Sequence, residues 1–270
     1  MKRHTDVASA TKDLLFLLSG NFSGRSNSPM NLRLEPDSLP LCDPGGECAI
    51  LFARTPVPGR VKSRFQPRLS PEQACALHCA ATSDTAALLA EALPHPTLWL
   101  FLSEAPSGSD ADGPMAGEIV LPPRFRCALQ SEGHLGDRMG AAFTRALSGG
   151  ARRVVIFGSD SPTLPRSVPP LAFHHLQESD LVVGPTDDGG YYLIGCRRFD
   201  PALFEGVEWS TPRTCAQTLA NAAKLGYRAS LLDRWFDLDS WSDIGRLLAD
   251  ARRGTPLPPH LEAFFQGFKP

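Results

Sequence analysis

Alternating strands and helices constrain the fold of this 270-residue chain more than any other feature. Short apolar runs such as "CAILFA", "TLWLFL" and "VVIFG" predict buried strands, and longer segments between them have helical composition. Near-continuous apolar strands are typical of a parallel sheet covered on both faces. We therefore predict an α/β fold, a three-layer α/β/α sandwich with a mostly parallel central sheet.

Capping residues mark the expected helices. Ser70 and Gln73 form a capping box, with a proline at the first helical position between them. Other helices are expected to end at a glycine or begin after a threonine or serine. The predicted helices span residues 70–93, 136–150, 167–177, 211–226 and 241–254.

The two ends of the chain differ from its middle. Residues 1–46 are rich in Ser, Asn, Pro and Gly without a sustained period, which predicts a loosely ordered extension. Residues 47–253 are expected to form one domain, because no long break interrupts the alternation. Residues 254–270 are interpreted as a C-terminal tail.

Composition narrows the class of protein. Lys and Arg number 27 against 29 Asp and Glu, giving a net charge of -2, and proteins that coat nucleic acid are normally more basic. The seven cysteines form no CxxC pair, which indicates reduced thiols and a cytoplasmic location. The most apolar early stretch, "LLFLLSG", is far shorter than the roughly 20 residues of a spanning helix. We expect neither nucleic acid nor a membrane as partner.

A basic loop, "ARTPVPGRVKSR", follows the first strand. Clustered cations on a turn shaped by prolines and Gly59 suit the oxygens of a di- or triphosphate, although a solvated basic loop is the alternative. The four cations predicted to bind phosphate are Arg54, Arg60, Lys62 and Arg64.

Acidic residues follow two other predicted strands. Asp160 comes two residues after "VVIFG", at the end of a strand where ligands bind in open α/β sheets, although a helix cap is an alternative role. Asp237, Asp239 and Asp243 surround a helix start, and one of them is expected to cap it. Asp239 is the best partner for Asp160, because two carboxylates and phosphate oxygens suit Mg²⁺ or Mn²⁺.

Two further segments combine acids or glycines with turns. Asp187 and Asp188 precede two glycines, so they form either a simple hairpin turn or a site that accepts a proton. Gly133 and Gly136, before a predicted helix, are expected to let the backbone approach a nucleotide closely.

Six ordered blocks resemble one known family. They are "FARTPVPGRVKSRF", "GHLGDRM", "GSDSPTLP", "GPTDDGGYYLIG", "VEWST" and "FDLDSWSDI", between about Cys48 and Ala249. Together they resemble the DUF2064 family of glycosyltransferase-A-like (GT-A) transferases, often labelled selenodomain-associated transferase 1. The resemblance implies the fold of the nucleotide-diphospho-sugar transferase superfamily, with a nucleotide site in the amino-terminal half.

The resemblance also implies roles for single residues. The basic loop would bind nucleotide phosphates, and Asp160 and Asp239 would hold the metal. The second acid lies in "DSWSD", where relatives read Asn-Thr-Pro-Glu-Asp or Asp-Thr-Pro-Glu-Asp. The loop departs from the Gly-Gly-x-Ser-x-Arg pattern and is closer to the Lys-Ser-Arg-Leu run of phospholactate guanylyltransferases.

Three functions remain open at this point. A metal-dependent glycosyltransferase would move a sugar from a nucleotide sugar to a small-molecule acceptor, with Asp187 or Asp188 as base. A guanylyltransferase-like nucleotidyltransferase would move a nucleotide to a phosphorylated small molecule, with Lys62 and the other cations stabilising the reacting phosphate. A non-catalytic nucleotide-binding protein is the third. The oligomeric state, base, sugar and acceptor are not specified by the sequence.

Overall fold

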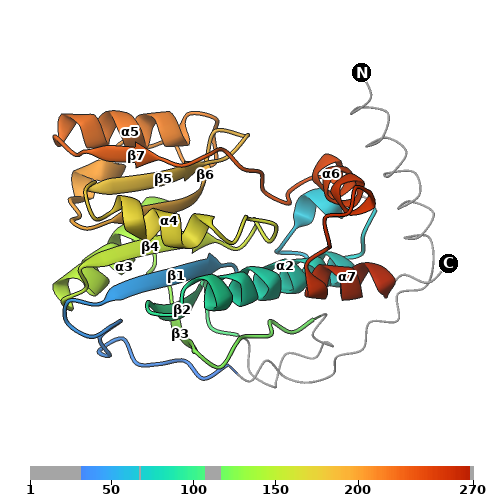
Figure 1. The fold of residues 1–270 in the computed structure, drawn as a ribbon. Helices are drawn as coiled ribbons and strands as arrows, with labels where there is room; N and C mark the ends of the chain where they lie inside the picture. Colours follow the sequence, from blue (N-terminus) through green and yellow to red (C-terminus); the bar gives the residue numbers. More distant parts are fainter. Residues whose placement is uncertain (1–31, 67, 107–116, 268–270) are drawn as a thin grey trace.

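The computed structural model describes residues 32–66, 68–106 and 117–267 (Figure 1). The strands are β1 (Glu47–Ala53), β2 (Thr97–Leu102), β3 (Phe125–Leu129), β4 (Arg153–Gly158), β5 (Leu181–Pro185), β6 (Tyr191–Cys196) and β7 (Ala229–Leu231). The α-helices are α2 (Pro71–Ala92), α3 (Leu135–Ser148), α4 (Val168–His175), α5 (Thr214–Lys224), α6 (Trp241–Arg252) and α7 (Pro259–Gln266). Two 3-10 helices are η1 (Ser63–Phe65) and η2 (Pro201–Phe204).

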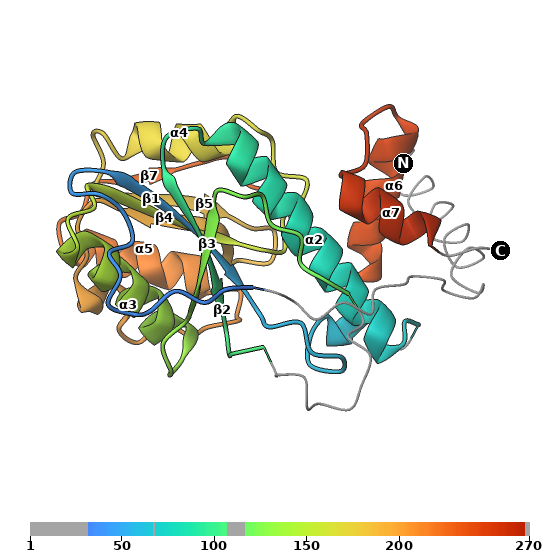
Figure 2. The ribbon, with the colours of Figure 1, turned by 90° about the horizontal axis from the view of Figure 1, so that it is seen from below.

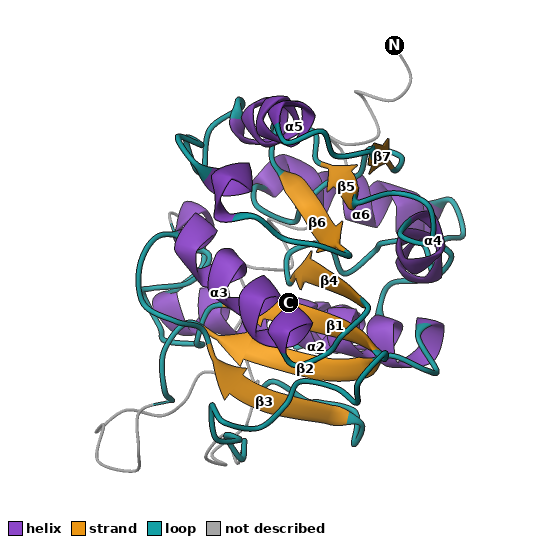
Figure 3. Cartoon of the chain, turned by 90° about the vertical axis from the view of Figure 1, so that its left-hand side faces the viewer, coloured by secondary structure: helices purple, strands orange, loops and turns teal. Residues whose placement is uncertain are grey.

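The described strands form a seven-stranded sheet in the order β3-β2-β1-β4-β6-β5-β7 (Figure 3). Strand β6 is antiparallel to β4 and β5, and the other pairs are parallel. The mostly parallel sheet is thus confirmed. The chain adds β2 and β3 on one side of β1 and returns with β4 on the other side. Such a reversal of strand order opens a ligand-binding crevice at the carboxyl ends of the strands.

Helices cover both faces of the sheet, as predicted (Figure 2). Alternate residues of a strand point to opposite faces. Leu51 of β1 therefore belongs to the core beneath α2 and α4, whereas Ile50 belongs to the core beneath α3 and α5. Both side chains are fully buried. The three-layer α/β/α sandwich is confirmed.

A third core cluster joins the C-terminal helices to the start of α2. Phe65 of η1 packs in this cluster with Leu77 of α2, Ile244 of α6 and Phe264 of α7. Figure 1 shows α6 and α7 beside η1, at the end of α2. The carboxylate of Asp84 accepts hydrogen bonds from the first backbone N–H groups of α7, at 2.9 and 2.8 Å. The segment interpreted as a tail therefore contributes a packed helix.

Local structure differs from the predictions at both ends and at one helix start. Residues 1–31 of the predicted extension lie outside the described part, whereas Leu41 is 1% exposed and its carbonyl accepts a hydrogen bond from Trp99. The extension thus already packs on the domain before residue 46. Helix α5 begins at Thr214 rather than after Thr211, because Thr211 and Thr214 first form a turn. Strand β3, at the edge of the sheet, was not predicted.

Candidate functional site

The site lies where β1 and β4 end side by side. Strand β1 continues into the basic loop, and Asp160 follows β4 two residues after Gly158. The two strands are parallel, with Phe52 opposite Gly158. The basic loop and Asp160 therefore meet at the same edge of the sheet, where the strand order reverses.

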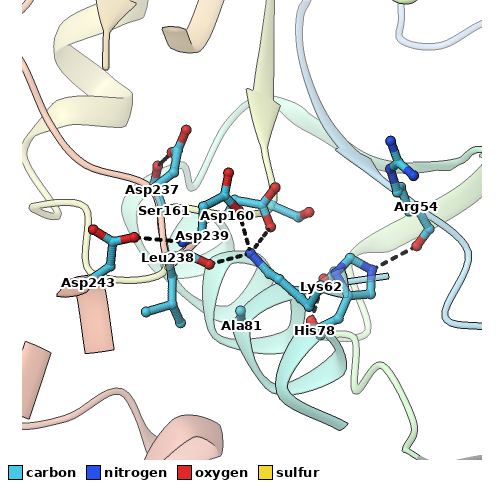
Figure 4. Close-up of polar contacts among 12 residues, drawn as sticks. Arg54, Lys62, His78, Ala81, Asp160, Ser161, Asp237, Leu238, Asp239 and Asp243 are labelled. Atoms are coloured by element: carbon cyan, nitrogen blue, oxygen red, sulfur yellow. Dashed lines mark hydrogen bonds and ion pairs between the residues drawn. The ribbon is translucent and has the colours of Figure 1, made fainter. Parts of the chain in front are cut away.

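Lys62 lies at the centre of this site, between two carboxylates (Figure 4). Its Nζ atom is 2.7 Å from Oδ1 of Asp160 and 3.0 Å from Oδ1 of Asp239. It also donates a hydrogen bond to the carbonyl oxygen of Leu238. The lysine side chain is 4% exposed, while the two carboxylates are 41% and 38% exposed. The acids can therefore still reach a ligand from the solvent side.

Charge pairing keeps these groups ionised. Burial by itself lowers the pKa of Lys62, but the carboxylates of Asp160 and Asp239 raise it above its usual value. Burial by itself raises the pKa of Asp160, but the Lys62 ammonium lowers it below its usual value. The site therefore holds a fixed positive charge flanked by carboxylates at neutral pH.

The backbone of Lys62 adopts a conformation that favours glycine. Its φ is 47° and its ψ is 37°, in the left-handed region, which costs an L-residue about 1–2 kcal/mol. The following helix η1 is anchored by buried Phe65, whose ring meets that of Trp241 edge-on. Residues in strained conformations persist where the surrounding packing holds them, and they concentrate at functional sites.

A third acid, Asp237, lies beside the pair. The hydroxyl of Ser161 donates a hydrogen bond to its Oδ1 at 2.5 Å. Burial, followed by the negative charges of Asp160 and Asp239, raises the pKa of Asp237 to about 7. The sequence placed Asp237 near a helix start but did not assign it to the site.

The raised pKa of Asp237 predicts a pH-dependent stability. An unfolded Asp has a pKa of about 3.9, so between about pH 4 and 7 only the folded protein retains this proton. This contribution to the free energy of unfolding is fully present below about pH 4, is lost as the pH rises to 7, and amounts to at most about 4 kcal/mol. Urea unfolding of metal-free protein at several pH values measures it. Asp237→Asn should remove this slope, exposed Asp233→Asn should retain it, and identical profiles for all three proteins would contradict the prediction.

The carboxylates of Asp160 and Asp239 can bind a divalent metal only if a substrate supplies further oxygen ligands. Oxygens of Asp160 and Asp239 converge on one cation, the Lys62 ammonium, and carboxylate oxygens suit Mg²⁺ or Mn²⁺. Among the described residues, no group of three or more His, Cys, Asp or Glu side chains could hold a metal ion. Two carboxylates leave most of a six-oxygen shell to phosphate and water. The residues therefore fit a metal that enters together with a nucleotide.

The structure divides the four cations that were predicted to act together. Arg60 pairs with Glu104 at 2.9 Å, and Arg54 lies 3.5 Å from the carbonyl oxygen of Arg60. Arg64 is 73% exposed and approaches Asp239 only to 3.7 Å. Lys62 alone is buried with the acids. In the structure Lys62 therefore lies apart from Arg54 and Arg60, and phosphate binding by all four cations stays a prediction.

The arginine group lines a pocket at the carboxyl ends of β1 and β2. The pocket has a volume of 220 Å³. Its described lining residues are Arg54, Thr55, Arg60, Val61, Ser103, Glu104 and Arg138. Neither Glu104 nor Arg138 was predicted as a site residue: Glu104 stands outside the quoted blocks, and Arg138 lies within "GHLGDRM", where only the two glycines were assigned to the site. Only the fold brings three guanidinium groups together here.

Hydrogen bonds fix the floor of this pocket, which we call the arginine pocket. The Thr55 hydroxyl donates to the carbonyl oxygen of Glu104 and accepts from its backbone N–H at 3.1 Å. Ser103 accepts a hydrogen bond from the Thr55 N–H. Buried His78 bonds the Arg54 carbonyl oxygen through Nε2 at 2.9 Å, and burial lowers the pKa of this imidazole. The backbone is therefore held, while the arginine and glutamate side chains face the pocket.

The three predicted glycines serve local structure. Gly59 has a φ of +82° in a turn with open space around it. Gly133, at a φ of +102°, leaves room for the Asp137 carboxylate, which caps α3. At Gly136, an added Cβ would lie 2.5 Å from the ring of Trp209. Gly136 therefore makes room for this indole, and the approach of a nucleotide to Gly133 and Gly136 stays a prediction.

The acids of the β5–β6 turn divide into two roles. Oδ1 of Asp188 accepts hydrogen bonds from the Thr186 hydroxyl and the Gly190 N–H, at 2.6 and 3.1 Å, which makes it a turn residue. Asp187 is 55% exposed and lies 3.2 Å from Arg246 of α6. The expected cap is Asp243, which accepts from the Ser240 N–H and hydroxyl at the start of α6. Of the two turn acids, Asp187 remains available to a substrate.

A family model and a solved structure match this chain. The model described as "Uncharacterized protein conserved in bacteria (DUF2064)" matches residues 87–211. A "putative nucleotide-diphospho-sugar transferase" from Desulfovibrio desulfuricans G20 is 28% identical with a TM-score of 0.67, over 83% of this chain and 98% of that chain. The resemblance to the DUF2064 family and the nucleotide-diphospho-sugar transferase type of fold are confirmed.

Other comparisons are weaker. The 4-diphosphocytidyl-2C-methyl-D-erythritol synthase of Anaerococcus prevotii DSM 20548 is 10% identical with a TM-score of 0.46, over 78% of this chain and 97% of that chain. A CMP:2-keto-3-deoxy-manno-octonic acid synthetase complexed with CTP has the same identity and TM-score, over 78% and 100%. The comparison with curated proteins gave no match. Within the described residues, no helix is long and apolar enough to cross a membrane.

Proposed function

We propose that this chain, which matches the DUF2064 family and has a GT-A-type fold, is a metal-dependent transferase that uses a nucleotide-activated donor. The observation that carries the proposal is the convergence of Asp160 and Asp239 on the buried Lys62 ammonium, at the point where the strand order reverses. The nearby arginine pocket adds positive charge for a nucleotide. The 28% identical transferase from Desulfovibrio desulfuricans supports the same class of reaction.

Glycosyl transfer from a nucleotide sugar is our first assignment. Asp160 and Asp239 would hold Mg²⁺ or Mn²⁺, which when bound supplies positive charge against a leaving diphosphate. Lys62 would donate hydrogen bonds to the phosphate oxygens, and its own positive charge would favour the leaving group. Asp187, exposed at the β5–β6 turn, would accept the proton of the acceptor hydroxyl. The acceptor would be a small molecule.

Nucleotidyl transfer is the second assignment, and the burial of Lys62 favours it. A lysine that is 4% exposed between two acids holds a fixed charge where a triphosphate would meet the metal. Such a charge would stabilise the oxygens of the α-phosphate while a phosphorylated small-molecule acceptor attacks it, and pyrophosphate would then leave. A non-catalytic nucleotide-binding protein is the remaining alternative. We also propose a cytoplasmic location, supported by seven free cysteines.

The test is a thermal-shift screen followed by product analysis. Nucleoside triphosphates and nucleotide sugars are each added with and without Mn²⁺. We expect a large rise in melting temperature only when metal and nucleotide are present together, because the two carboxylates need phosphate oxygens to complete the metal site. Hits are then incubated with mixed small-molecule acceptors. Release of nucleoside diphosphate identifies glycosyl transfer, and release of pyrophosphate identifies nucleotidyl transfer.

Three results would contradict the proposal. Stabilisation by no nucleotide at any metal concentration would exclude the donor class. Equal stabilisation by nucleotide with and without metal would exclude the role assigned to Asp160 and Asp239. Binding without release of either product from any donor would favour the non-catalytic alternative.

A further inference from the structure

The arginine pocket contains a carboxylate that phosphate binding does not explain. Glu104 lines it together with Arg54, Arg60 and Arg138. A phosphate placed there would meet the negative charge of Glu104, whereas the Lys62 ammonium lies outside this set, among acids that can share a metal with phosphates. Val61, the neighbour of Lys62, also lines the pocket. One nucleotide can therefore place its phosphates at Lys62 and another of its parts in the arginine pocket.

The Glu104 carboxylate is free to change partners. Thr55 holds the backbone of Glu104 through a hydrogen bond. The Glu104 side chain is 42% exposed. In the ion pair described for it, its partner is Arg60, whose side chain is 65% exposed. Exposed ion pairs contribute about 0–1 kcal/mol, so a ligand separates this pair at little cost. The pocket thus offers a ligand one carboxylate acceptor and several guanidinium donors.

This set of groups matches the edges of one nucleobase. A carboxylate accepts two parallel hydrogen bonds, and guanine offers two adjacent donors, N1–H and the 2-amino group. Arginine binds the guanine acceptors O6 and N7 in a bidentate manner. Adenine and cytosine place a ring acceptor beside their amino group, and uracil flanks its single N–H with carbonyl oxygens. Each of these would set an acceptor against the carboxylate.

We propose that the arginine pocket binds guanine, with Glu104 accepting from N1–H and the 2-amino group and an arginine donating to O6 and N7. The pocket volume of 220 Å³ accommodates a base but not a whole nucleotide. The inference rests on the proposed nucleotide-dependent function and assigns the base of its donor. It makes Glu104 the residue that determines base specificity.

Calorimetric titration of the full chain with five nucleotides tests the proposal. GTP, ITP, ATP, CTP and UTP are each titrated with Mg²⁺. We expect GTP to bind about 5- to 150-fold more tightly than ATP, CTP or UTP, which is the discrimination of one bidentate contact. ITP lacks only the 2-amino group of GTP and should bind about tenfold more weakly than GTP. This comparison needs no variant, so it stands even if a substitution disturbs folding.

A variant and its matched control complete the test. Glu104→Gln should lower the preference for GTP over ATP to within about threefold, because an amide offers one acceptor and one donor. Glu91→Gln changes another exposed glutamate, which pairs with Arg166 at 2.7 Å outside the pocket lining, and should leave the preference unchanged. Equal binding of GTP and ITP, or an unchanged preference in Glu104→Gln, would overturn the guanine assignment alone. Failure to bind any of the five nucleotides, together with no stabilisation by any nucleotide sugar in the thermal-shift screen, would overturn the proposed function as well.

Discussion

Replacing Lys62 with methionine is expected to lower turnover with the identified donor by about 100- to 1,000-fold, the usual cost of removing one fixed donor to a developing charge. Nucleotide affinity should fall by about 10- to 150-fold, because a charge-assisted hydrogen bond contributes roughly 1.5 to 3 kcal/mol. Methionine keeps the length and apolar stem of lysine but removes the ammonium. Asp160 and Asp239 are more than a third exposed, so water can hydrate them in the variant.

Arg64→Met is the matched control for Lys62. Arg64 lies two residues further along the same loop, but its side chain is 73% exposed and 3.7 Å from Asp239. Its loss should change nucleotide affinity by less than about fivefold at 0.15 M salt, because exposed charges are screened. Titration calorimetry and initial rates on both variants provide the comparison. If Arg64→Met costs as much as Lys62→Met, all four loop cations act together, and the division seen in the structure has no functional meaning.

Neutralising either metal-site acid is expected to reduce metal-dependent nucleotide binding by at least about 100-fold. Asp160→Asn and Asp239→Asn keep the shape of the side chain but remove one of the two anionic ligands that are assigned to the metal. Nucleotide binding without metal should fall little or even strengthen, since each substitution removes negative charge near the phosphates. The ratio of affinities with and without Mn²⁺ is the diagnostic quantity.

Asp233→Asn serves as the control for these two variants. Asp233 precedes the metal-site segment and is exposed, so its substitution should leave the Mn²⁺-dependent ratio unchanged. Far-UV circular dichroism and the melting temperature without ligands report whether each variant folds. If a folded Asp160→Asn or Asp239→Asn protein keeps the full ratio, these carboxylates do not hold the metal.

Local sequence patterns predicted the layers of the fold because strands that are covered by helices on both faces consist of nearly continuous apolar residues. The apolar runs of β1, β2 and β4 and the capping box at Ser70 needed no tertiary information. Strand β3 was missed because it is a short edge strand, with Arg126 interrupting its apolar residues. Helix α7 was missed because its N-terminus is capped by Asp84, 176 residues earlier in the chain. A cap so distant leaves no local signal.

The sequence by itself determined which residue types gather at the carboxyl ends of β1 and β4, since strand ends and polar motifs can be read along the chain. Only the tertiary structure decided how they pair. Lys62 pairs with Asp239, which lies 177 residues further along the chain. Arg60 is separated from Lys62 by one residue but pairs with Glu104 in the arginine pocket. Side-chain direction decides this, because the left-handed backbone at Lys62 redirects the loop. The spacing of residues along a loop does not show in which direction each side chain points. In the folded protein this direction is fixed because Phe65 packs against the C-terminal helices.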